Sequence, residues 1–123
     1  MDTHPVVGLE REALQRWCKS DPDGFLDLCA PDVVYFDPFV KERLDGLGKL
    51  TAYYNSIRGK VFAGQYEMID PCVQEIGDAA VLTFRFNSSS SEGQMRWNCT
   101  EVYRCASADW RIVQTHWSFT TRG

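Results

Sequence analysis

The sequence predicts a single α+β domain in which a curved antiparallel sheet wraps around three N-terminal helices. The first half of the chain repeats apolar residues at helical spacing, and the second half alternates apolar and polar residues. Helices gathered first and strands gathered after them are typical of α+β domains. A length of 123 residues is enough for one core, so we expect one domain over residues 1–123.

Three helices are expected before residue 60. The first covers about 6–19, where apolar residues recur on one face. The second begins at Asp21, which can cap it, and continues to the proline at position 31. The third covers about 47–58, and Gly59 lies just past its end, where a glycine often ends a helix.

Five strands are expected, one between the second and third helices and four in a row after the third. The alternation of apolar and polar residues places them at 33–36, 66–76, 79–87, 95–106 and 110–119. Pro71 falls inside one of them, and proline cannot donate to a sheet ladder. We therefore expect an edge position or a bulge at Pro71.

The composition excludes several classes of function. The net charge is −4 and no cluster of Lys and Arg is present, which argues against a nucleic-acid surface. No apolar run is long enough to span a membrane, and the first residues lack the pattern of a secretory signal. The five cysteines are widely spaced without a C-x-x-C pair, which favours reduced thiols over disulfides or structural zinc. These features together predict a cytoplasmic protein without metal or cofactor.

The stretch VVYFDP carries a carboxylate to the end of an apolar strand. Asp37 is followed at once by Pro38, which restricts the backbone before it to an extended conformation. One interpretation is an ordinary turn, because Asp-Pro is common turn chemistry. The other is an acid held at the mouth of a pocket.

Two more ionisable groups lie on apolar strand faces. Strict alternation places Glu101 on the same side as Trp97 and Tyr103, and His116 on the same side as Ile112. A buried carboxylate is costly unless it is paired, neutral or next to water. Three alternatives stay open: a turn role for Asp37, an exposed convex-face position for Glu101 and a structural role for His116.

Three segments of the chain resemble sequences of the nuclear transport factor 2-like superfamily. They are KSDPDGFLDLCAPDVVYFDP, LDGLGKLTAYY and WRIVQTHWS. The superfamily has a cone-shaped, cystatin-like fold and includes ketosteroid isomerases and snoaL-like polyketide cyclases. The resemblance implies that Asp37 is the general base and Glu101 the protonated acid of a ketosteroid isomerase-like pair. The tyrosine donor of that family falls near Ala13, which has no donor, and the cyclase acid/base role would fall to His116.

A third resemblance is to the association domain of calcium/calmodulin-dependent kinase II. It runs through YEMIDPCVQEIGDAAV and the THWS near the end of the chain. That domain oligomerises and is not an enzyme. Fold alone therefore does not decide between catalysis and assembly.

The expected function is binding of a hydrophobic small molecule, with proton transfer next to a carbonyl as in an isomerase, cyclase or dehydratase. Asp37, Glu101 and His116 are the candidate catalytic residues. Aromatic and polar side chains expected to line the cavity are Trp17, Tyr35, Tyr54, Trp97, Tyr103 and Gln114. The alternative is a non-catalytic binding or oligomerisation domain. A homodimer is expected through an apolar outer sheet face formed by Val102, Val113, Trp117 and Phe119.

Overall fold

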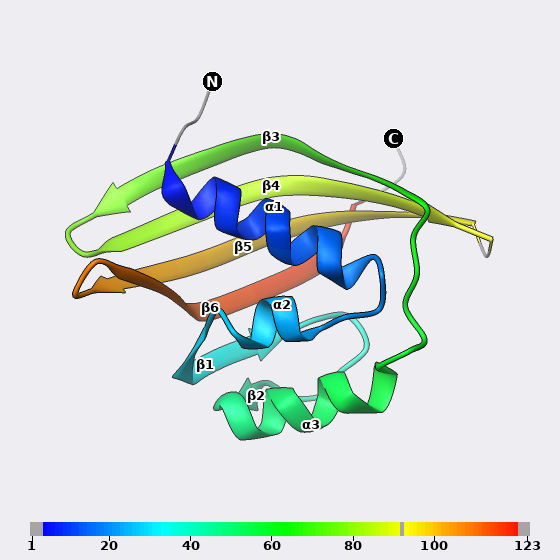
Figure 1. Ribbon diagram of the computed structural model, residues 1–123, viewed down its shortest axis with the longest axis horizontal. Helices are drawn as coiled ribbons and strands as arrows, with labels where there is room; N and C mark the ends of the chain where they lie inside the picture. Colours follow the sequence, from blue (N-terminus) through cyan, green and yellow to red (C-terminus); the bar gives the residue numbers. More distant parts are fainter. Residues whose placement is uncertain (1–3, 92, 121–123) are drawn as a thin grey trace.

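The computed structural model describes residues 4–91 and 93–120, and its sheet curves around helices on one face (Figure 1). The expected α+β class is confirmed. Its elements, in chain order, are α1 Pro5–Trp17, α2 Asp23–Leu26, β1 Cys29–Phe36, β2 Leu44–Asp45, α3 Leu47–Ile57, β3 Gln65–Ile76, β4 Ala79–Ser90, β5 Gly93–Ala106 and β6 Asp109–Phe119.

The strands form one six-stranded sheet in the order β2-β1-β6-β5-β4-β3. The meander from β3 to β6 is antiparallel, as expected, but β1 runs parallel to β6. The short strand β2 was not expected from the sequence; it pairs with β1 at Val34 and Tyr35. The last long strand of the chain therefore lies inside the sheet, between β1 and β5.

The second helix is much shorter than the expected span of 21–31. Only Asp23–Leu26 is helical, and β1 already begins at Cys29. Pro31 explains the difference, because the residue before a proline avoids the helical conformation. Ala30 is buried in the sheet instead. The prediction of a helix continuing to the proline was wrong.

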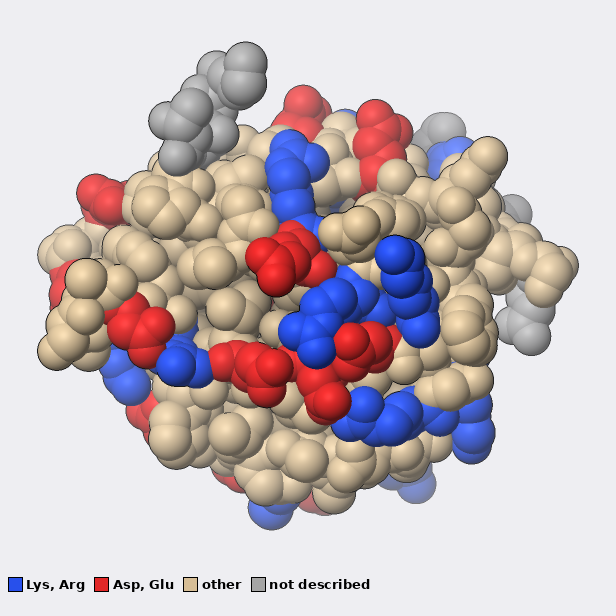
Figure 2. Space-filling view, in the orientation of Figure 1, with Lys and Arg blue, Asp and Glu red and all other residues tan. Residues whose placement is uncertain are grey.

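The core fills the space between α1 and the concave side of the sheet. Buried residues of α1 and α3, such as Leu14 and Leu50, meet buried strand residues such as Leu82 and Ile112. Figure 1 shows α1 lying across the sheet, with α2 and α3 beyond it. Acidic and basic side chains are intermixed near the centre of the face shown in Figure 2.

The strand β3 contains the irregularity expected at Pro71. Its register with β4 shifts between Ile69 and Cys72, and Asp70 adopts a left-handed φ of 52°. β3 is also an edge strand of the sheet. Both features accommodate a residue that cannot donate to a neighbouring strand.

A second irregularity, in β6, reverses the faces expected for its later residues. Val102 pairs with Gln114 but Tyr103 pairs with Ile112, so Val113 is an extra residue. Beyond such a bulge the alternation is shifted by one position.

The inward side chains after the bulge are therefore Thr115, which is buried, and Trp117, which packs on the core. Gln114 and His116 are exposed instead. The prediction that they share the inner face with Ile112 was wrong. The placement of Trp117 and Phe119 on the outer face was also wrong, since Phe119 pairs with Trp97 and its ring packs against that of Trp97.

Candidate functional site

A pocket of about 420 Å³ opens between the helices and one end of the sheet. Most of its wall is aromatic or aliphatic, which is typical of small-molecule sites. Its main apolar residues are Trp17, Phe39, Ile57, Phe86, Met95, Trp97 and Trp117. Its polar side chains include Asp37, Tyr35, Tyr53, Lys60 and Ser88.

Asp37 lies at the polar corner of this pocket and accepts four hydrogen bonds. The hydroxyls of Tyr35 and Tyr53 donate to Oδ2 over 2.7 and 2.6 Å. The backbone N–H groups of Phe39 and Val40 donate to Oδ1 over 2.7 and 3.1 Å. The same carboxylate thus shapes the turn after β1 and faces the pocket, so the two interpretations of VVYFDP are compatible.

The two tyrosines of this corner differ in burial. Tyr35 is buried, whereas Tyr53 is half-buried and comes from α3. Burial and the neighbouring Asp37 carboxylate raise the pKa of both hydroxyls above the usual range for tyrosine. Both hydroxyls therefore keep their protons and act as donors to Asp37.

Four of the predicted site residues lie at this pocket: Trp17, Tyr35, Asp37 and Trp97. Tyr54 lies behind the wall, with its ring 5.0 Å from that of Trp17 and 5.6 Å from that of Tyr35. Tyr54 is not one of the described residues that line the pocket, but it packs against two residues that do.

Glu101 and Tyr103 belong to a second, buried cluster under α1. The Tyr103 hydroxyl donates to Oε1 of Glu10 over 2.6 Å, and Glu10 and Glu101 both have an exposed fraction of 0%. Burial raises the pKa of Glu10 to about 7, and burial together with the Glu10 charge raises that of Glu101 well above its usual range. The Thr115 hydroxyl and Cys99 thiol lie near Glu101 and oppose this rise.

His116 and Gln114 lie on the outer face of the sheet because of the bulge at Val113. The His116 ring packs against Phe36 of β1, with 5.2 Å between ring centroids. The structure therefore does not bring Asp37, Glu101 and His116 together in one cavity. Among the described residues, only Asp37 of these three lines the pocket.

The sequence reasoning missed several residues of these two sites, among them Tyr53, Trp117 and Glu10. Tyr53 was not among the expected site residues, although it follows Asp37 by 16 positions and donates to it. Trp117 was placed on the outer face. Glu10 shares a helix face with Val6 and Ala13, and this spacing is the signal that a charged residue of α1 points inward.

The comparisons with known proteins agree with this architecture. A family model described as a SnoaL-like domain matches residues 11–122. The chain belongs to the SnoaL-like domain family. A search of curated proteins found no match.

Several solved structures are similar to this SnoaL-like chain. A candidate ketosteroid isomerase from Parabacteroides distasonis is 41% identical, with a TM-score of 0.85 over 94% of this chain and 86% of that one. An NTF2-like protein of unknown function from Pseudomonas putida is 21% identical, with a TM-score of 0.82 over 95% and 85%. A CaMKII hub from S. rosetta is 22% identical, with a TM-score of 0.75 over 98% and 100%. The latter two likenesses show the fold alone.

None of the described helices of this SnoaL-like chain is both long and apolar enough to cross a membrane. Figure 2 shows mixed charge on the helix-covered face. Arg16 pairs with Asp21 over 2.8 Å, and Arg58 pairs with Asp23 over 2.7 Å. These basic groups are engaged by carboxylates.

Proposed function

We propose that this protein binds a hydrophobic small molecule in the Asp37 pocket and catalyses proton transfer next to a carbonyl. The observation that carries the proposal is one carboxylate in a pocket whose wall is otherwise mostly aromatic or aliphatic. The proposed reaction is an isomerisation, cyclisation or dehydration that needs no cofactor. The likeness to a candidate ketosteroid isomerase at 41% identity supports the same chemistry.

In the proposed step, Asp37 removes a proton from the carbon next to the carbonyl. The electron pair of the broken C–H bond moves to the carbonyl oxygen and forms an enolate. Lys60 also lines the pocket, and its ammonium group supplies positive charge that can stabilise that oxygen. In an isomerisation the proton is returned to another carbon of the substrate. In a cyclisation the enolate carbon attacks a second carbonyl of the substrate and the proton goes to the oxygen of that carbonyl. In a dehydration a hydroxide leaves and takes the proton with it as water.

Asp37 needs a free lone pair for this role, and at present four donors occupy its oxygens. Tyr53 is the donor that can yield, because it is half-buried and comes from a separate helix. We propose that substrate displaces the Tyr53 hydroxyl from Oδ2. The backbone donors on Oδ1 then keep the carboxylate in place.

Hydrogen exchange at the substrate carbon tests this proposal directly. The protein is mixed in D₂O with apolar ketones, 2-tetralone and a β,γ-unsaturated 3-ketosteroid, and NMR follows loss of the α-proton signals. The native chain should accelerate exchange of at least one ketone, and Asp37→Asn should reduce that acceleration by about a hundredfold or more. His116→Ala is the matched control, because this ionisable group lies on the outer face. Equal rates for the native chain and Asp37→Asn would contradict the proposal.

The second candidate is an assembly role, which the likeness to CaMKII hubs favours. A row of outer-face residues crosses the sheet at Val81, Val102, Gln114 and Val34. We propose a homodimer through this face, and light scattering should give twice the chain mass at micromolar concentration. Val102→Asp at the centre of the row should return the mass to that of a monomer, while Glu12→Gln on α1 should not. A monomer mass for the native chain would remove this candidate.

A further inference from the structure

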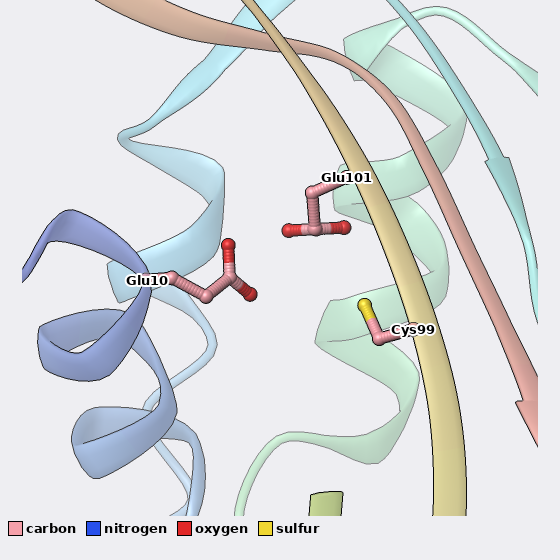
Figure 3. Close-up of side chains that lie close together, drawn as sticks. All are labelled: Glu10, Cys99 and Glu101. Atoms are coloured by element: carbon pink, nitrogen blue, oxygen red, sulfur yellow. The ribbon is translucent and has the colours of Figure 1, made fainter. Parts of the chain in front are cut away.

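Three potential metal ligands converge in the core beneath α1, away from the Asp37 pocket. Glu10 comes from α1, and Cys99 and Glu101 come from β5. One ligand atom from each residue lies within 4.8 Å of the others, and the exposed fractions are 0%, 3% and 0%. Figure 3 shows the two carboxyl groups pointing toward each other with the Cys99 sulfur beside Glu101.

Although the Thr115 hydroxyl and the Cys99 thiol lie near Glu101, no donor of the described residues makes a well-formed hydrogen bond to the Glu101 oxygens. Tyr103 donates to Oε1 of Glu10. Among the described residues, Oε2 of Glu10 and both oxygens of Glu101 have no hydrogen-bond partner. A proton shared between the two carboxyls would pair one oxygen of each and still leave one oxygen of Glu101 alone. A buried polar atom without a partner costs about 1–3 kcal/mol, and more when it is charged.

Among the residues that the structure describes, no lysine or arginine is buried beside the cluster to balance its charge. None of the Lys and Arg side chains in the described part of the chain is buried, and His116 is exposed. Two buried carboxylates without a positive partner are expensive, so buried charges are usually paired or bind a metal. A divalent cation would balance both carboxylates.

We propose that Glu10, Cys99 and Glu101 hold one divalent transition-metal ion, for which Zn²⁺ is the probe. Carboxylate oxygen and cysteine sulfur together suit Zn²⁺, whereas Mg²⁺ and Ca²⁺ take only oxygen ligands. Ligand atoms around tetrahedral zinc lie about 3.5 Å apart, given Zn–O and Zn–S distances of about 2.1 and 2.3 Å. Only small side-chain shifts are then needed from the present separation.

Tyr103 fits the proposed site as an orienting residue. By donating to Oε1 of Glu10, it fixes that carboxyl and leaves Oε2 directed at the cluster. Hydrogen bonds of this kind commonly hold metal-binding carboxylates in place. Because all three ligands are buried, the ion would be taken up as the chain folds and would stabilise the fold. The sequence alone predicted no metal, since Glu10 was not recognised as facing inward.

Refolding tests the proposal with an untagged full-length chain. The protein is unfolded with denaturant and chelator, then refolded with Zn²⁺, with Mg²⁺ or with no divalent metal. Mass spectrometry of the desalted protein should find one zinc per chain, and the melting temperature should rise by several degrees with Zn²⁺ only. Refolded protein that holds no zinc and melts at the same temperature in all three conditions overturns the proposal.

Variants show whether any zinc found sits in the cluster. Glu101→Gln and Cys99→Ser should each lose the ion and the zinc-dependent rise in melting temperature. Glu101→Gln keeps the side-chain shape and is neutral, so it should still fold; Glu10→Gln serves the same purpose from α1. Cys72→Ser and Glu12→Gln change exposed residues and should keep the ion.

Cobalt provides a spectroscopic readout of the same site. Co²⁺ bound by a thiolate gives a sulfur-to-metal charge-transfer band, which Cys72→Ser should retain and Cys99→Ser should lose. If zinc or the cobalt band survives in both Glu101→Gln and Cys99→Ser, the metal is adventitious and the proposal is wrong.

Discussion

The hydroxyl of Tyr53 donates a hydrogen bond to Oδ2 of Asp37 over 2.6 Å, which ties α3 to the end of β1. The contact closes the polar corner of the pocket. It also makes Asp37 a structural residue as well as a candidate base, because the carboxylate receives donors from α3, from β1 and from the following turn.

Asp37→Asn should destabilise the fold by about 1–3 kcal/mol, because an amide replaces one acceptor oxygen with a donor. Either the two tyrosines or the two backbone N–H groups then face another donor. Urea unfolding measures the change, with Asp32→Asn as the control, since Asp32 is an exposed partner of Arg104. A neutral result would contradict the four hydrogen bonds described for Asp37.

Tyr53→Phe should cost about 1 kcal/mol of stability, since one of four donors to Asp37 is lost. If Tyr53 must yield to substrate, the variant should also bind apolar ketones at least as well as the native chain. Thermal unfolding without and with 2-tetralone measures both the stability of the variant and its binding of the ketone. Tyr66→Phe on β3 is the matched control, and tighter binding in the control than in Tyr53→Phe would argue against the displacement step.

Trp117→Ala and His116→Ala should differ sharply, although the residues are adjacent. Trp117 lines the pocket, and its ring meets those of Phe84, Phe86 and Trp97 at 5.9, 6.1 and 5.9 Å. Trp117→Ala should lower the free energy of unfolding by about 3 kcal/mol and abolish ligand binding. His116→Ala should change stability by less than about 0.5 kcal/mol, as is usual for surface positions. Similar losses in both variants would contradict the bulge at Val113.

All five thiols should be free, and their reaction with a thiol reagent should follow their burial. Cys72 is exposed, Cys105 is partly exposed, and Cys18, Cys29 and Cys99 are buried. Burial also raises the pKa of Cys18 to about 11, so little of its reactive thiolate exists at neutral pH. In the native protein one thiol should therefore react quickly with the reagent, and in the denatured protein all five should react. A count of three reactive thiols in denaturant would indicate one disulfide, and a count of one would indicate two.

The sequence predicts most of this fold because its hydrophobic periods are clear. The third helix and the four later strands agree with the structure to within a few residues. Tyr35 and Trp97 point to the inner side of the sheet, as expected, since the alternation holds in the second half of β1, from Val33 to Phe36, and along β5 from Trp97 onward.

The positions of His116 and Gln114 could not be predicted in the same way. A bulge adds a residue without changing the composition of a strand, so nothing in the amino-acid sequence around Val113 reveals it. The inward direction of Glu10 depends on how α1 rotates against the sheet. That rotation is decided by packing over distances of more than ninety residues, such as the contact with Tyr103.

The central place of β6 has a consequence for synthesis of the chain. β1 has only the two-residue β2 on its other side, and its main partner, Asp109–Phe119, is translated about eighty residues later. β6 must therefore emerge from the ribosome before β1 can dock and α1 can cover a complete sheet. Contacts between such distant segments slow folding. The growing chain would present the apolar side of α1 to chaperones throughout that interval, and its fold is completed only after translation of β6.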